Sequence, residues 1–438
     1  MEKKEKFGLS NSQKLLLLFQ LLNRKKSDGN VCGSITIKQK IDTDKLEKAI
    51  NKFIENNDSV RTRICFTLLG FKQYFAEYEP IKVEVIDVES EQDVKDIEDK
   101  INHEVFSMIE KPLYKIKIFK FKDGTGGFIG CMHHIICDAW TIGLTINEIL
   151  SYYTESGIEY PRFSYADHVK SEKEYLKSNR LKNDKKYWDN LVKNDLPPAA
   201  IIDGDLNIED KARKCGNNIY CIEKSTINKI NEYCNKIKIS QCSFITGVYA
   251  LYIGKRANLN KCILDVILSN RSNYKEKNTI GLFAKTAGTV AKIGNTSFEK
   301  YILDINKELT KTYKHYKYST SKILKEVHKL EPKRKRLSKI WFSFQNAKTD
   351  TKSINLQYTT RWTPLETTYL YDMLIELYDL NNDGSLNIIY YYLLSKYSKK
   401  RIDEIHNGIC SIINQVIENN NINIEDIIID ENSLAMNS

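Results

Sequence analysis

Two adjacent histidines are the residues of this chain best suited to chemistry. His133 and His134 are followed, after three further residues, by Asp138, between an apolar run at 127–132 and an apolar helical pattern at 141–153. Because adjacent side chains of a strand point to opposite faces, one histidine can face a cavity while the other faces packed core. This arrangement disfavours a metal site that uses both, so we predict no metal. It favours an acid/base or positioning role for one histidine.

The helix and strand patterns along the chain, which must position these residues, predict a mixed α/β (α+β) protein. A chain of 438 residues is too long for one ordinary core, so we expect two lobes, residues 1–175 and residues 176–438. The charged segment 170–195 predicts a helical connector that ends at Pro197. Ile81, Val83 and Val85 alternate with charged residues and predict a strand in the first lobe.

The charge and composition restrict the class of partner. The 67 basic and 57 acidic residues give a formal net charge of +10, which is mild for this length and suggests an acidic protein partner. Since no nucleic-acid motif or platform of aromatic and basic residues accompanies the charge, we predict no nucleic acid. The basic run Lys333–Arg336 is interpreted first as a solvated loop, with a carrier contact or a nuclear-import or nucleic-acid patch as alternatives.

Neither the cysteines nor the apolar runs indicate export or membrane insertion. The ten cysteines show no paired or zinc-type spacing, which fits a reduced, cytoplasmic setting. The apolar run Leu15–Phe19 is short and lacks a cleavage site, so a helix capped by Ser10 or Ser12 explains it better than a signal peptide. No segment approaches the roughly 20 apolar residues of a membrane span.

The segment 133–140, HHIICDAW, resembles the HHxxxDG signature of the condensation domains of nonribosomal peptide synthetases. These belong with thioester-dependent acyltransferases related to chloramphenicol acetyltransferase. Further segments resemble the family's shorter motifs in the family's order, at 10–14, 57–63, 111–114, 165–167, 187–188, 269–271, 280–283 and 342–346. The resemblance implies two chloramphenicol-acetyltransferase-like lobes in a V-shaped pseudo-dimer, with the active site in a tunnel between them.

The same resemblance implies roles for the residues of the signature. His134 is expected to act as the base or the positioner of the acceptor amine, and His133 to shape the turn through backbone hydrogen bonds. Asp138 is expected to pair with an arginine, with Arg271 preferred and Arg61 as second choice.

Other positions in or near the family motifs are less regular. Ala139 stands where the family usually has glycine, so a requirement for positive φ would strain this loop. Cys137 beside the histidines raises a Cys–His nucleophile as a minor alternative, without an accompanying orienting signature. Trp140, Tyr165 and Asn346 are candidates for the tunnel lining, and each could equally pack in the core.

The function implied is a stand-alone condensation enzyme that forms an amide, or less often an ester, in nonribosomal-peptide-type, antibiotic or other secondary-metabolite biosynthesis. The donor is an acyl or aminoacyl thioester on a carrier protein supplied in trans, and the acceptor is a carrier-bound or small-molecule amine. No cofactor is expected beyond the phosphopantetheine or CoA that carries a substrate. Alternatives are a CoA-dependent acyltransferase acting on a small alcohol or amine, an epimerisation domain, and a non-catalytic docking module.

Overall fold

A computed structural model describes residues 5–345, 356–365, 367–368, 370–378 and 384–432. Within them the chain forms two compact units, the first from residues 5–177, 269–285 and 356–364, and the second from the remainder. The division expected at 175/176 treated each lobe as continuous, whereas two later segments lie with the first unit. The physical reason is that Arg271 pairs with Asp138, and that residues 358–362 form a strand beside Asn30–Ile37.

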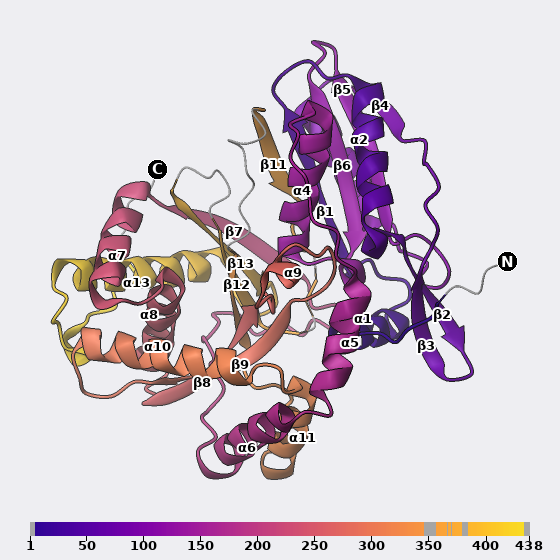
Figure 1. Ribbon diagram of the computed structural model, residues 1–438. Coiled ribbons are helices and arrows are strands. Elements are labelled where there is room, and N and C mark those ends of the chain that lie inside the picture. The colour runs from indigo at the N-terminus through magenta and orange to yellow at the C-terminus, as the bar shows by residue number, and fades with distance from the viewer. Residues whose placement is uncertain (1–4, 346–355, 366, 369, 379–383, 433–438) are drawn as a thin grey trace. The chain divides into compact units, whose positions relative to one another are not determined.

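The first unit is built on a five-stranded sheet in the order β11-β1-β6-β5-β4 (Figure 1). All neighbours are antiparallel except β4 and β5, which run parallel. Its strands are β1 (Asn30–Ile37), β4 (Glu84–Val88), β5 (Tyr114–Phe121), β6 (Gly126–His133) and β11 (Tyr358–Trp362). A separate hairpin joins β2 (Thr62–Thr67) to β3 (Gly70–Phe75).

Helices of the first unit share one buried apolar cluster with this sheet. Helix α2 packs on α4, and α3 packs on β1, β4 and β6. The helices are α1 (Asn11–Leu22), α2 (Thr43–Asn56), α3 (Glu91–His103), α4 (Ala139–Thr154), α5 (Tyr165–Tyr175) and α9 (Tyr274–Lys277), with 3₁₀ turns η1 (Asp58–Arg61) and η2 (His134–Ile136). Of the two predicted caps for α1, the N-cap is Ser10, whose hydroxyl accepts from the Gln13 N–H.

The strand predicted around Ile81, Val83 and Val85 begins later, at Glu84. Side chains of α2 bind the backbone ahead of it, because Asn51 accepts from the Ile81 N–H and Glu47 accepts from the Val83 N–H. These N–H groups are therefore satisfied without a neighbouring strand.

The second unit is built on a six-stranded sheet in the order β7-β13-β12-β10-β8-β9. Strand β10 is parallel to both β12 and β8, whereas β13 is antiparallel to β12 and β7. The strands are β7 (Cys215–Ile222), β8 (Lys261–Leu268), β9 (Lys285–Lys292), β10 (Ile340–Gln345), β12 (Met373–Tyr378) and β13 (Leu386–Leu393).

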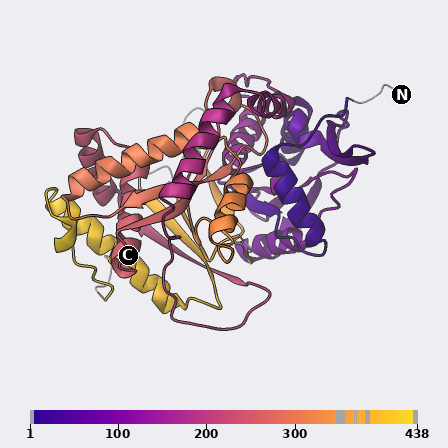
Figure 2. The ribbon, with the colours of Figure 1, turned by 90° about the horizontal axis from the view of Figure 1, so that it is seen from below.

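One face of this second sheet shares a large apolar core with helices. Helix α8 contacts α7, α10 and α13, and α6 packs on α11. Figure 2 shows these helices from below, with α10 in orange and α13 in yellow. Their bounds are α6 (Asn179–Asn194), α7 (Lys224–Ile237), α8 (Gln241–Arg256), α10 (Phe298–His315), α11 (Thr320–Leu330) and α13 (Lys399–Glu418), followed by a 3₁₀ turn η3 (Ile424–Asp426).

The fold is therefore mixed α/β, as predicted. In the described part of the chain, no helix is both long enough and apolar enough to cross a membrane. The basic run at 333–336 is not simply a solvated loop. The Arg334 guanidinium donates to the carbonyls of Pro197 and Leu337, and only 8% of its side chain is exposed.

Candidate active site

The two histidines lie where β6 ends and the chain turns towards α4. His133 is the last residue of β6, and His134 opens the 3₁₀ turn η2. Backbone hydrogen bonds hold both, since the His133 N–H donates to Leu113 O at 2.9 Å and the His134 N–H donates to Gly29 O at 2.7 Å. The turn is thus tied to its neighbouring segments before any side chain contributes.

The His133 side chain is a buried part of the turn, with 1% of the residue exposed. Its Nδ1 accepts from the Ile135 N–H at 3.1 Å, so the proton of the neutral ring lies on Nε2, which is 3.3 Å from Gln20 Oε1. A Cβ on Gly29 would lie 2.4 Å from Nε2. Burial, and then the neighbouring His134, lowers the pKa of His133 to about 3. The ring is therefore neutral near pH 7.

The His134 side chain is half-buried and is held in the opposite tautomer. Its Nδ1 is 2.6 Å from the backbone oxygen of Cys137. A carbonyl oxygen can only accept, so Nδ1 carries the proton and Nε2 of the neutral ring keeps a lone pair. Within the described residues, Nε2 makes no hydrogen bond. It is the nitrogen available to take a proton or to accept from an amine.

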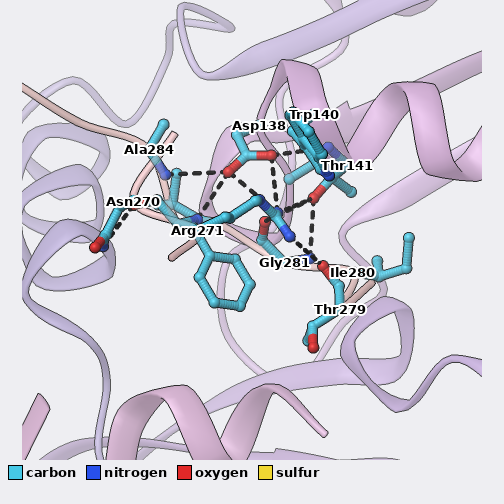
Figure 3. A network of polar contacts seen from close by, with 12 residues as sticks. Asp138, Trp140, Thr141, Asn270, Arg271, Thr279, Ile280, Gly281 and Ala284 are labelled. Atoms are coloured by element: carbon cyan, nitrogen blue, oxygen red, sulfur yellow. Dashed lines mark hydrogen bonds and ion pairs between the residues drawn. The ribbon is translucent and has the colours of Figure 1, made fainter. Parts of the chain in front are cut away.

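Asp138 and Arg271 form a buried ion pair directly after this turn, as Figure 3 shows. The Asp138 Oδ1 lies 3.1 Å from Arg271 Nη2, and Oδ1 also caps α4 by accepting from the Thr141 N–H at 2.8 Å. The other oxygen, Oδ2, accepts from the N–H groups of Phe283 at 2.9 Å and Ala284 at 3.0 Å. One carboxylate thus joins the start of α4 to the segment 281–284.

The guanidinium of Arg271 has more partners than the carboxylate alone. It donates to the carbonyls of Thr279 and Gly281 and to the Thr141 hydroxyl, and it lies 4.0 Å from the centre of the Phe283 ring. Burial lowers the pKa of Arg271, and the Asp138 charge opposes that shift.

Each charge of this pair stabilises the charged form of the other group. Burial alone would raise the pKa of Asp138, but the Arg271 charge and the three N–H donors outweigh it and leave that pKa below its ordinary value. We infer that both groups are charged at neutral pH.

The second-choice arginine lies elsewhere in the same unit. Arg61 donates to the carbonyls of Ile54, Glu55 and Ala76, and among the described residues it makes no hydrogen bond or ion pair with Asp138. The pairing preferred from the sequence, with Arg271, is the one present. Both arginines therefore brace loops through backbone oxygens, but it is Arg271 that forms the ion pair with Asp138.

Ala139 does not require the conformational freedom of glycine. It is the first residue of α4, and it is absent from the described non-glycine residues with positive φ. Ala139 is therefore not strained by a positive φ, and its methyl group differs from glycine only in the volume that it occupies. As the first helical residue, Ala139 has an N–H without an acceptor inside the helix.

Cys137 lacks the properties of a nucleophile. Burial raises the pKa of its thiol well above the ordinary value, and the thiol donates to the His133 carbonyl at 3.6 Å. A reactive cysteine needs a lowered pKa and access to substrate. What Cys137 supplies here is the backbone oxygen that orients His134.

The three candidates for the tunnel lining have different surroundings. Tyr165 is 1% exposed and packs on Phe283, with its hydroxyl donating to Leu282 O. This is the core-packing alternative. Trp140 is half-buried and its indole N–H donates to Lys277 O at 2.8 Å. Asn346 lies outside the described residues.

Three residues that the sequence reasoning did not assign to the site complete it. Gln13 donates from Nε2 to the Ile135 carbonyl at 3.1 Å and so holds the turn after His134. The Thr141 hydroxyl donates to Gly281 O and accepts from Gly281 N–H. Gln13 lies in the motif-like segment 10–14 and Gly281 lies in the segment 280–283, but no local pattern indicates which residues they contact.

Over the described ranges, no group of three or more His, Cys, Asp or Glu side chains is placed to hold a metal ion.

Comparison with known proteins identifies the family. A family model described as Condensation domain matches residues 3–432. The chain belongs to the condensation-domain family. Condensation domains are acyltransferase-type enzymes of nonribosomal peptide synthesis, where their general role is amide-bond formation with carrier-bound substrates.

Similar proteins include surfactin synthase subunit 1 of Bacillus subtilis (strain 168), 25% identical over 432 residues, and gramicidin S synthase 2 of Aneurinibacillus migulanus, 19% identical over 431 residues. The alignments cover 94% and 97% of this condensation domain but 12% and 10% of those two proteins. Among solved structures, the starter condensation domain of rhizomide synthetase in complex with C8-CoA and Leu-SNAC matches with a TM-score of 0.83 and 14% identity, over 96% of both chains. This likeness shows the fold.

Proposed function

We propose that this condensation domain transfers an acyl group from a carrier-bound thioester to an amine, with His134 as the residue that handles the amine proton. The observation that carries the proposal is the 2.6 Å contact from His134 Nδ1 to Cys137 O. It fixes the neutral tautomer whose Nε2 lone pair can accept from the attacking amine.

The reaction would proceed by addition and elimination. The amine nitrogen attacks the thioester carbonyl carbon and forms the C–N bond, and the C–S bond then breaks to release the carrier thiol. The proton lost by the nitrogen passes to His134 Nε2 and from there to the departing sulfur. Holding the two reactants together supplies much of the rate by itself, because a bimolecular step becomes effectively unimolecular.

The start of α4 is suited to the charge that develops on the carbonyl oxygen. Asp138 accepts from the Thr141 N–H, while the Ala139 N–H has no acceptor among the described residues. An unpaired N–H at a helix N-terminus favours negative charge, and such donors stabilise tetrahedral intermediates. We infer that the Ala139 N–H holds the carbonyl oxygen.

The test is acyl transfer followed by intact mass spectrometry. A carrier protein loaded with an acyl thioester is supplied as a separate protein and incubated with the enzyme and an amine that is either free or carrier-bound. His134→Ala should reduce transfer by at least about 100-fold, the scale of a lost general base. His328→Ala, which changes an exposed histidine of the second unit, should transfer like the wild type.

Two other results would redirect the assignment. Transfer from acyl-CoA but never from a carrier would indicate a CoA-dependent acyltransferase. Stable carrier binding without transfer from either donor, over several acyl groups, would indicate a docking module. Undiminished transfer by a folded His134→Ala protein would remove His134 from the mechanism.

A further inference from the structure

The second sheet presents two faces of different character. Along β12, Met373, Ile375 and Leu377 belong to the large core shared with the helices, whereas Leu374 and Tyr378 belong to a smaller cluster. Because side chains alternate along a strand, Glu376 lies on the face of the smaller cluster. Ser343 on β10 and Ile389 on β13 pair with it in the ladder and lie on that same face.

Glu376 is a half-buried carboxyl group with no hydrogen bond or ion pair to any described residue. Burial raises its pKa to about 7, with no opposing interaction. A buried charge is costly unless it is paired, so most buried carboxylates have a cation or several donors. Among the described residues, Glu376 has neither a cation nor a hydrogen-bond donor as a partner.

Aromatic side chains surround this carboxyl group. Burial, and then the Glu376 charge, raises the pKa of Tyr378 and of Tyr391. The charge also acts on Tyr371, after burial and Cys215, and the Tyr371 ring lies 5.3 Å from the ring of Trp341. Aromatic faces attract organic cations, so rings beside a carboxylate suit a bound ammonium group.

A second unpaired polar pair lies on the same face. Asp265 on β8 and Trp341 on β10 are opposite each other in the ladder. Asp265 is 4% exposed, and the nearby Trp341 side chain and the Ser338 N–H both favour its charged form, although neither Asp265 Oδ1 nor Trp341 Nε1 has a partner with full hydrogen-bond geometry. Buried polar atoms are nearly always paired in folded proteins, and unpaired ones call for a ligand or another explanation. Two carboxyl groups on this face therefore have unused acceptor capacity.

We propose that this face of the second sheet binds an alkylammonium group, with Glu376 as its counter-ion and the rings of Tyr378, Tyr391 and Trp341 around it. An amine held as an ammonium ion by a carboxylate has no lone pair for attack, so the site binds its ligand without reacting with it. The ligand class is an alkylamine or a diamine.

Calorimetric binding of 1,5-diaminopentane to the full protein tests this, with 1-pentanol as the neutral comparison. Both amines stay protonated from pH 6 to pH 8, whereas the ionised fraction of a carboxyl group with a pKa near 7 rises roughly tenfold. We expect the Kd to fall by about that factor over this range. Glu376→Gln should weaken binding at pH 8 at least tenfold and abolish the pH dependence, while Glu418→Gln, at an exposed position, should change neither.

The other titratable groups facing Glu376 must be separated from it. Tyr371, Tyr378 and Tyr391 have raised pKa values and stay neutral in this range, but burial also raises the pKa of Asp265 to about 7. The pH dependence should therefore persist in Asp265→Asn. Absence of binding, equal binding of 1-pentanol, or unchanged binding by a folded Glu376→Gln protein would each overturn the proposal.

The binding result is independent of the proposed transfer. Diamine binding that needs Glu376, in a protein that transfers no acyl group, would leave the site standing and remove the condensation reaction. Transfer to simple monoamines without any Glu376-dependent diamine binding would remove the ammonium site and leave the condensation reaction standing. The melting temperature of Glu376→Gln, which should equal or exceed that of the wild type, shows that the variant is folded.

Discussion

His133 and His134 are neighbours in the chain but hold their ring protons on different nitrogens. His133 Nδ1 accepts from the Ile135 N–H, whereas His134 Nδ1 donates to the Cys137 carbonyl. Both contacts are made within one 3₁₀ turn, so the same few backbone atoms set both tautomers. A buried neutral ring and a half-buried ring with a free lone pair result from this single turn.

The first prediction concerns acid stability. The pKa of His133 falls from 6.5 to about 3 on folding, so its contribution to stability is fully present above pH 6.5 and is lost as the pH falls towards 3. The full loss is on the order of 5 kcal/mol, at about 1.4 kcal/mol for each pKa unit. His133→Gln should flatten the fall in urea-unfolding free energy between pH 7 and pH 4.5. A residual slope is expected, because burial also lowers the pKa of His406 to about 4.

The second prediction concerns the buried ion pair. Asp138→Asn leaves the Arg271 charge buried without its counter-ion, which should cost about 3–5 kcal/mol of unfolding free energy. Asp87→Asn changes an exposed aspartate of the same unit and should cost less than about 0.5 kcal/mol. Urea denaturation followed by circular dichroism measures both. Equal stability of the two variants would show that the pair contributes nothing to folding.

The part of this site that the sequence could predict is the part encoded in one short segment. A strand, a turn and a helix around residues 127–153 follow from local apolar patterns, and a signature with known partners points from Asp138 to Arg271. The tautomers could not be predicted, because they depend on which backbone oxygen or N–H the folded turn presents to each ring. The hydrogen bond between the Thr141 hydroxyl and Gly281 O joins residues that lie 140 positions apart in the chain, so no local pattern could indicate it.

Local alternation also gave the wrong boundary for one strand and missed an assembly of distant segments. Val83 and Ile81 have the alternation of a strand, but side chains of α2 bind their N–H groups. Strand β11 lies far along the chain yet pairs with β1, and nothing in its five residues marks that partner. Such pairings are decided by the whole sheet rather than by the segment itself.

The third prediction concerns Gly281, where the backbone itself requires glycine. Its φ is +147°, and a Cβ would lie 2.2 Å from Tyr165 Cδ2, which is itself packed in the core. Gly281→Ala should therefore cost roughly 2–4 kcal/mol, from backbone strain and overpacking together. Gly130→Ala is the matched control, since nothing lies within 4 Å of its added Cβ. Similar denaturation midpoints for the two variants would contradict this account of Gly281.

The last prediction separates the N–H of Ala139 from its side chain. Proline suits the first position of a helix, and Asp138 before it has φ −136° and ψ 175°, an extended conformation that a following proline accepts. Ala139→Pro should thus keep stability within about 1 kcal/mol while removing the N–H that we assign to the carbonyl oxygen. Acyl transfer should then fall about 100-fold, whereas Ala139→Gly, which keeps the N–H, should stay within roughly threefold of wild type. Equal transfer rates for the proline and glycine variants would exclude this N–H as a donor to the transition state.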